Sequence, residues 1–235
     1  MDLTECGKCG APIGWDEDIC ARCCTPKGQG RLPPGHLVLN RYCVGDMIGV
    51  GGQGQVFRGT DKKTGKTVAI KVIYASLGSR AYDVFSRFER EIKLVMGLRH
   101  TNIVEYLEVD VERDMAILVM EYVCGESLGD LIRRNGANLA LSDALVIFDQ
   151  VLQGMHAAHA HQIVHRDIKP ENILIRQSDK VVKITDFGLA KKASTGNTQL
   201  TGPVQKGPSA TGQLLGTSYY MSPEQAKGIT SIDAL

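Results

Sequence analysis

Residues 165–172 read His-Arg-Asp-Ile-Lys-Pro-Glu-Asn, and Asp186-Phe187-Gly188 follows a little further along the chain. This stretch supplies a proton acceptor in Asp167, a cation in Lys169, and two oxygen-bearing side chains, Asn172 and Asp186, of the kind that Mg²⁺ prefers. The set suits transfer of a phosphoryl group from a magnesium nucleotide to a hydroxyl, a reaction that needs positioning and charge stabilisation. Any one of these residues alone is more simply a solvated loop residue. Their joint order and spacing favour the chemistry.

A second group of residues could hold the nucleotide. Residues 49–56 read Gly-Val-Gly-Gly-Gln-Gly-Gln-Val, and glycine lets a backbone approach phosphates closely. Alone, the pattern is equally well a glycine-rich hairpin turn. A dinucleotide-binding fingerprint would need a helix directly after Gly54, and the residues that follow are strand-like, so we reject that alternative.

A buried charge is expected in the next strand. Lys71 follows Val68-Ala69-Ile70, and an unpaired lysine in such apolar surroundings is costly unless it faces solvent. Glu91 lies on the apolar face of an expected helix over 82–98. An ion pair between Lys71 and Glu91 would explain both positions.

The order of elements favours an α+β fold with two packed lobes, the first rich in strands and the second in helices. The expected strands cover residues 42–49, 55–60, 67–73, 103–107 and 115–120. A second helix is expected over 142–161, with Ser142 as its N-cap. Its apolar face would carry Leu145, Phe148, Leu152 and Met155.

The first 24 residues hold five of the seven cysteines. Two Cys-x-x-Cys pairs have the spacing of a structural zinc site, with Cys24 as a competing neighbour; the four expected ligands are Cys6, Cys9, Cys20 and Cys23. Because so short a head cannot build a core, Zn²⁺ would supply its folding energy. Disulfides, loose thiols and a rubredoxin-like iron site are the alternatives. Residues 25–41, rich in Gly, Pro and polar residues, are predicted to be a linker.

Composition limits the classes of binding partner and the cellular compartments that are expected for this chain. A formal net charge of +1 gives no reason to expect nucleic acid or an anionic membrane as partner. No apolar run approaches the length of a transmembrane helix, and the N-terminus is not a secretory start. Together with the cysteine usage, this favours a reducing cytoplasm, and a membrane anchor beyond residue 235 is left open.

These motifs resemble those of the protein kinase superfamily. Lys169 and the run Gly216 to Glu224, which ends in Ser-Pro-Glu, are most similar to bacterial serine/threonine kinases of the eukaryotic type. The resemblance implies a bilobal kinase fold preceded by the zinc ribbon at 1–24. The kinase domain would span 42–235, with an N-lobe at 42–120, a hinge at 121–125 and a C-lobe at 126–235 that is incomplete after the activation segment.

The resemblance also implies roles for the site residues. Asp167 would accept the proton of the substrate hydroxyl, and Lys169 would neutralise charge on the transferred phosphoryl group. Asn172 and Asp186 would hold Mg²⁺, while Lys71, paired with Glu91, would hold the ATP phosphates. The nucleotide pocket would comprise Ile48, Gly49, Gly51, Gly52, Gly54, Val56, Ala69, Lys71, Glu121, Val123, Asn172, Leu174 and Asp186, with the backbone of 121–123 bonding the adenine edge.

The implied function is transfer of the γ-phosphoryl group of Mg-ATP to Ser/Thr hydroxyls of protein substrates, including autophosphorylation. Arg166 would pair with a phosphorylated residue of the activation segment; the candidates are Thr195, Thr198, Thr201, Ser209 and Thr211. The zinc head would bind a partner or regulate the kinase. The alternative function is a zinc-ribbon adaptor whose kinase-like module binds nucleotide without catalysis, and a small-molecule kinase is disfavoured.

Family members continue through several helices beyond the position of Leu235. The sequence therefore predicts a fragment of reduced stability and activity. It also predicts that Leu145, Phe148 and Leu152 are partly uncovered.

Overall fold

The computed structural model describes residues 4–5, 12–13, 32–51, 54–74, 89, 92–112, 115–136, 138–187, 220 and 222. The chain divides into two units. The sheet unit comprises Met1–Met96 and Glu105–Tyr122, and the helix unit comprises Gly97–Val104 and Val123–Leu235.

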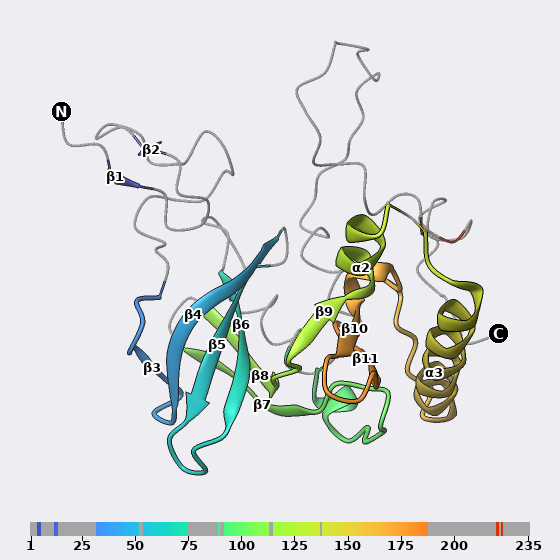
Figure 1. The fold of residues 1–235 in the computed structure, drawn as a ribbon. Helices are drawn as coiled ribbons and strands as arrows, with labels where there is room; N and C mark the ends of the chain where they lie inside the picture. The colour runs from blue at the N-terminus through green and yellow to red at the C-terminus, as the bar shows by residue number, and fades with distance from the viewer. Residues whose placement is uncertain are drawn as a thin grey trace, which may run out of the picture. The chain divides into compact units, whose positions relative to one another are not determined.

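A six-stranded antiparallel sheet with the order β3-β4-β5-β6-β8-β7 forms the sheet unit (Figure 1). Its strands are β3 (Leu37–Val38), β4 (Tyr42–Gly51), β5 (Gly54–Asp61), β6 (Thr67–Tyr74), β7 (Tyr106–Glu112) and β8 (Met115–Glu121). The short strands β1 (Thr4–Glu5) and β2 (Pro12–Ile13) pair separately. Four expected strands are present as β4, β5, β6 and β8, because each alternates or runs apolar between turn residues.

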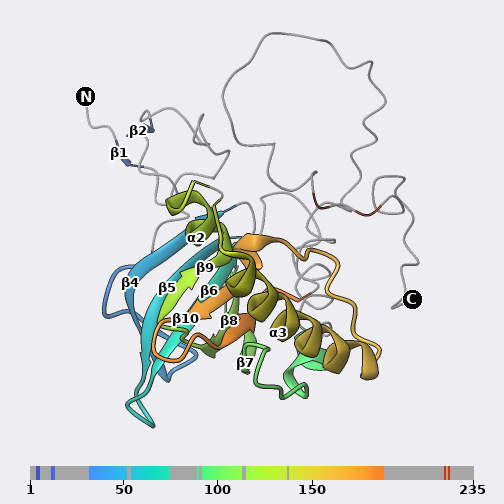
Figure 2. The ribbon, with the colours of Figure 1, turned by 45° about the vertical axis from the view of Figure 1, so that its right-hand side comes forward.

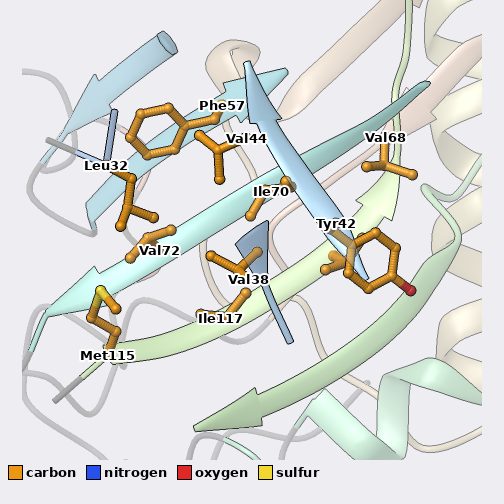
Figure 3. Packing of buried hydrophobic residues seen from close by; sticks show 11 residues of the cluster. Leu32, Val38, Tyr42, Val44, Phe57, Val68, Ile70, Val72, Met115 and Ile117 are labelled. Atoms are coloured by element: carbon orange, nitrogen blue, oxygen red, sulfur yellow. The ribbon is translucent and has the colours of Figure 1, made fainter. Parts of the chain in front are cut away.

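The core of the sheet unit follows from the two-residue period of its strands. Val68, Ile70 and Val72 share one face of β6 and belong to one buried cluster (Figure 3). The neighbouring strands add Val44, Phe57, Ile117 and Val119 to that cluster. Full burial of each such side chain contributes about 1.5–3 kcal/mol, so this face provides much of the driving force for folding of the unit.

The predicted linker at 25–41 differs from the structure in its described part, which begins at Leu32. Leu32 and Val38 are buried in the core cluster, where Figure 3 shows both side chains. Strand β3 pairs with the start of β4, and the Gly35 N–H donates to Val44 O at 2.7 Å. The prediction rested on the Gly and Pro content of this stretch and gave no weight to its apolar residues. Because those residues are buried, the stretch is part of the sheet unit.

A charged cluster joins the start of β4 to the end of β5 and to β7. The Arg41 guanidinium donates to both carboxylate oxygens of Asp61, each at 2.8 Å, and the Tyr42 hydroxyl donates to Glu108 at 2.6 Å. The bidentate bond from Arg41 holds the pKa of the Asp61 carboxyl well below its usual range. A depressed carboxyl pKa favours folding above the unfolded pKa near 3.9, so acid weakens this cluster only below about pH 4.

In its described residues the helix unit contains a three-stranded antiparallel sheet with the order β11-β10-β9 (Figure 1). The same residues form two helices, which Figure 2 shows. The strands are β9 (Gly125–Ser127), β10 (Ile173–Arg176) and β11 (Val182–Ile184). The helices are α2 (Leu128–Arg134) and α3 (Leu141–Ala160), with a 3₁₀ turn, η1, at Pro170–Asn172. No helix in the described part of the chain has the length and apolarity needed to cross a bilayer.

Helix α3 differs from its prediction in two respects. Its N-cap is Ala140, which makes no side-chain cap hydrogen bond, and Ser142 lies inside the first turn. Its buried residues are Val151, Gly154 and Ala158, whereas three of the four residues on the predicted apolar face are exposed and the fourth, Met155, is half-buried. On that face Leu145, Phe148 and Leu152 are 58 %, 59 % and 50 % exposed, as the sequence predicted for these three.

Residues 97–104, which follow most of the expected helix at 82–98, group with a different unit than predicted. Ile103 was expected to open a strand of the first lobe, but β7 begins at Tyr106. Residues 97–104 group with the helix unit, where Val104 N–H donates to Ile184 O and Ile184 N–H donates to Asn102 O, each at 2.9 Å. These bonds hold the segment against β11.

Candidate active site

The glycine-rich turn connects β4 to β5 within the sheet unit. Gly49 pairs with Val56, and Gly51 pairs with Gly54 at the end of the ladder. Gly54 has a φ of +120°, and a Cβ added there would lie 2.2 Å from Val72 O. The sheet itself therefore requires glycine at position 54, whatever the turn binds. Gly52 lies outside the described residues.

Lys71 lies in the middle of β6 and is only 4 % exposed. It shares the face of Ala69, opposite the core cluster, and its cross-strand neighbours are Val56 and Leu118. This burial excludes the alternative of a solvent-facing lysine. Glu91 lies outside the described residues, so the ion pair stays a prediction.

The predicted adenine-binding stretch spans the boundary between the two units. The Glu121 N–H donates to Glu105 O at 2.9 Å within the sheet unit, so this N–H is not available to a nucleotide. In the helix unit, Cys124 O accepts from Gln177 N–H at 2.9 Å, which ties the segment before β9 to the β10–β11 turn. Leu174 is half-buried on β10, and Ile48 is exposed on β4.

Asp167 is buried and is held by two neighbours in its own loop. Its Oδ2 atom accepts from Lys169 Nζ at 2.9 Å and from Asn172 Nδ2 at 3.1 Å. Asn172 Nδ2 also donates to the main-chain oxygen of Asp167 at 2.7 Å. Among the described residues nothing donates to Asp167 Oδ1, so the carboxylate is fixed through one oxygen and presents the other.

Asn172 closes the η1 turn and is itself buried. Because its Nδ2 donates twice to Asp167, its Oδ1 must point to the opposite side of the amide. The main-chain oxygen of Asn172 accepts from Thr185 N–H at 2.9 Å, one residue before Asp186. The β10–β11 ladder thus brings Asn172 and Asp186 to the same end of the small sheet.

His165 links the loop to the strand that carries Asp186. Its Nδ1 accepts from Asp167 N–H at 3.2 Å, and its Nε2 faces Thr185 O at 2.8 Å. A backbone N–H can only donate and a carbonyl can only accept, so the ring must be neutral with its proton on Nε2. The ring also packs against Phe187, with centroids 4.5 Å apart.

Two residues of this site have left-handed backbones, Arg166 with φ +64° and Asp186 with φ +63°. Such conformations cost on the order of 1–3 kcal/mol each outside glycine and persist only where neighbours impose them. Arg166 lies between His165 and Asp167, which are joined by a hydrogen bond from Asp167 N–H to His165 Nδ1, and Asp186 follows Thr185, whose N–H donates to Asn172 O and whose carbonyl faces His165 Nε2. The fold therefore holds the site in shape.

We expect the stability of the protein to depend on pH through His165. Burial lowers the pKa of the imidazole below its ordinary value near 6.5. A lowered histidine pKa costs stability as pH falls below the unfolded value, because the folded state resists the proton that the unfolded state accepts. His165→Gln cannot titrate, and its amide can still donate to Thr185 O. The difference in Tm between wild type and His165→Gln should shift in favour of the variant from pH 7.5 to pH 5.5. A difference that stays constant over this interval would contradict this role.

Several predicted site residues lie outside the described part of the chain. They include Glu91, Gly52, the four predicted zinc ligands and the candidate phosphorylation sites. Within the described ranges, no group of three or more His, Cys, Asp or Glu residues could hold a metal ion. The predictions for the undescribed residues therefore stay predictions.

The model of the protein kinase domain family matches residues 42–232. The chain belongs to this family. Within the kinase domain, the sheet unit supplies the β-rich N-lobe, as predicted.

Three curated relatives that match the chain are named as bacterial kinases. The probable serine/threonine-protein kinase of Clostridium acetobutylicum is 36 % identical over 83 % of this chain and 28 % of its own length. The corresponding values are 38 %, 83 % and 29 % for PknB of Lactococcus lactis, also named a probable serine/threonine-protein kinase. The serine/threonine-protein kinase PknA of Mycobacterium tuberculosis is 38 % identical over 83 % of this chain and 43 % of its own length. The matched region thus spans less than half of each of these relatives.

The sequence motifs pointed to Asp167, Lys169 and Asn172, which the structure brings together, but missed two residues that hold β11. Asn102 and Gln150 both make hydrogen bonds to the backbone of Val182. Their residue types carry no signal of this role, because the contacts join parts of the chain that are far apart in sequence.

Proposed function

We propose that this kinase domain transfers the γ-phosphoryl group of Mg-ATP to Ser/Thr hydroxyls of proteins, including its own activation segment. The observation that carries the proposal is Asp167, whose Oδ2 is held by Lys169 and Asn172 while its Oδ1 is presented. The relatives named serine/threonine kinases support the choice of acceptor.

Asp167 would act as the proton acceptor in this reaction. A substrate hydroxyl that donates a hydrogen bond to Oδ1 would be oriented for attack on the γ-phosphorus of ATP. As the new P–O bond forms, the bond from the γ-phosphorus to the β–γ bridging oxygen would break, ADP would leave, and the hydroxyl proton would pass to the carboxylate. Lys169 lies 2.9 Å from Asp167 Oδ2, where its charge also counters charge on the transferred phosphoryl oxygens.

The residues present fit a hard cation. The amide oxygen of Asn172 points away from Asp167, and Asp186 adds a carboxylate at the same end of the β10–β11 ladder. These are the oxygen ligands that Mg²⁺ prefers, and the ion would neutralise charge on the nucleotide phosphates. Lys71, buried on the face of β6 opposite the core cluster, would bind the phosphates from the sheet unit.

The proposal also covers the cysteine-rich N-terminal residues and the cellular location of the chain. Cys6, Cys9, Cys20 and Cys23 would bind one structural Zn²⁺, in a head that binds a partner or regulates the kinase. Metal analysis should give one zinc per chain in the wild type and none in a Cys20→Ser, Cys23→Ser double variant. Zinc-free wild-type protein would contradict this site. The cysteine usage supports a cytoplasmic location.

One experiment separates catalysis from nucleotide binding alone. Mg-ATP should raise the Tm of the chain, and labelled phosphate from ATP should enter protein. A Tm shift without any transfer would favour the alternative, an adaptor with an inactive kinase-like module. Absence of both would contradict nucleotide binding as well.

A further inference from the structure

Strand β11, which leads into Asp186, is hydrogen-bonded along both edges. One edge pairs with β10. On the other edge, Val182 N–H donates to Gln150 Oε1 at 2.9 Å, and Asn102 Nδ2 donates to Val182 O at 3.0 Å. Ile184 completes this edge through Asn102 O and Val104 N–H, each at 2.9 Å. At the start of β11, the side chains of Gln150 and Asn102 therefore make the hydrogen bonds that the backbone of a neighbouring strand would otherwise make.

Gln150 is the residue that connects these groups. Its Oε1 accepts from both Val182 N–H and Asn102 Nδ2, the latter at 3.1 Å. Its Nε2 points to Lys180 O in the β10–β11 turn at 3.4 Å, a long contact of lesser weight. Gln150 therefore ties helix α3 to β11 and to the segment before β7 through a single acceptor atom.

The packing of α3 allows this bridge. Gly154 lies one turn after Gln150, and a Cβ at Gly154 would lie 2.9 Å from Ile184 Cδ1 and 3.0 Å from Asn102 O. Only glycine lets the helix approach so closely. The small residue and the glutamine together bring α3 into contact with the strand.

The position of β11 determines where the residues that follow it, Thr185 and Asp186, lie in the candidate site. Thr185 follows the strand and is held by Asn172 O and by His165, and Asp186 comes next with a left-handed backbone. A strained residue keeps its conformation only while its flanking structure is fixed. We propose that Gln150 is a positioning residue for Asp186, acting through β11. Its consequence for Mg²⁺ rests on the proposed function, whereas its effect on β11 does not.

The test compares three variants of the full chain. Gln150→Leu has a similar volume but can accept no hydrogen bond, and it leaves Val182 N–H and Asn102 Nδ2 without their acceptor. Gln150→Glu keeps a carbonyl-like oxygen at the same distance from the helix. Gln153→Leu is the matched control, because Gln153 is exposed on the same helix and bonds only to Asp149 among the described residues.

Two readouts distinguish positioning from a general loss of stability. The first is amide hydrogen exchange at Val182 and Ile184 in protein without nucleotide or metal. The second is the Mg²⁺ concentration that half-saturates binding of ADP, followed by a Tm shift. In Gln150→Leu we expect exchange to accelerate and the Mg²⁺ requirement to rise, each about tenfold, the size expected for orphaned buried donors. Gln150→Glu and Gln153→Leu should stay near wild type.

The Mg²⁺ requirement distinguishes a positioning residue from a purely structural one. A lower Tm in Gln150→Leu with an unchanged Mg²⁺ requirement would show a purely structural residue and overturn the proposal. If Gln150→Leu does not fold, a tenfold higher Mg²⁺ requirement in folded Gln150→Glu would equally overturn it, and wild-type behaviour there would support it. Both readouts are independent of phosphate transfer, so a chain that transfers no phosphate would fail the proposed function without deciding this inference.

Discussion

Asp167→Asn is expected to lower the rate of phosphate transfer by about 10²–10⁴-fold, the size of a lost general base. The asparagine side chain can accept from Lys169 and Asn172 through its oxygen, but it cannot take up the proton of a hydroxyl. Binding of Mg-ATP should be kept, because Asp167 is proposed to contact the acceptor hydroxyl and not the nucleotide.

The measurement is incorporation of labelled phosphate at saturating ATP, with the Tm shift by Mg-ATP as the check on binding. Asp179→Asn is a matched control, since Asp179 is an exposed aspartate in the β10–β11 turn that pairs with Arg176. Its transfer rate should match wild type. Wild-type transfer by Asp167→Asn would remove this residue from the mechanism.

Lys71→Met is expected to reduce transfer by about 10²–10³-fold, the size found when one charge-stabilising donor is removed from an active site. Methionine keeps the unbranched stem that fills the buried site on β6, so the N-lobe should fold. The loss should appear in kcat and in the apparent KM for ATP, because the lysine is proposed to contact the phosphates.

The control for this change is Lys66→Met, at an exposed position just before β6. It removes the same charge from the same protein and should transfer phosphate normally. If both variants behave alike, the effect comes from net charge and not from a group in the site. Glu91→Ala should resemble Lys71→Met, since the glutamate is predicted to position the lysine.

The strands of the N-lobe could be predicted because their signals are local. In β6 the residues Val68, Ile70 and Val72 alternate with a second face, and turn residues bound the strand on the N-terminal side. The catalytic loop could be predicted because its groups lie within eight residues of one another. In both cases the pattern that carries the prediction lies within a few residues of sequence.

Long-range contacts explain what the sequence missed. Val38 joined the core because it meets β4 and the rest of the sheet, although its surroundings in sequence are typical of a linker. Ile103 was expected in a strand of the first lobe, but its bridge to Ile184 places it elsewhere. Gln150 lies 48 residues from Asn102 and 32 from Val182, and nothing near it in sequence indicates either partner.

The apolar pattern on α3 shows a second limit. Residues 145, 148 and 152 repeat at helical spacing, which identifies an apolar face but not what covers it. The described structure buries the other face, where Val151, Gly154 and Ala158 pack. The helical spacing of the apolar residues predicted the helix. Which side of the helix is buried depends on its packing against β11.

The most direct test of the central claim is to incubate the 235-residue chain with Mg²⁺, γ-labelled ATP and a general protein acceptor, and then to identify the labelled residues. We predict label on serine and threonine, from the wild type and not from Asp167→Asn. Label that is absent from folded, ATP-binding wild type, or equal in wild type and Asp167→Asn, would contradict the claim that this kinase domain is a protein serine/threonine kinase.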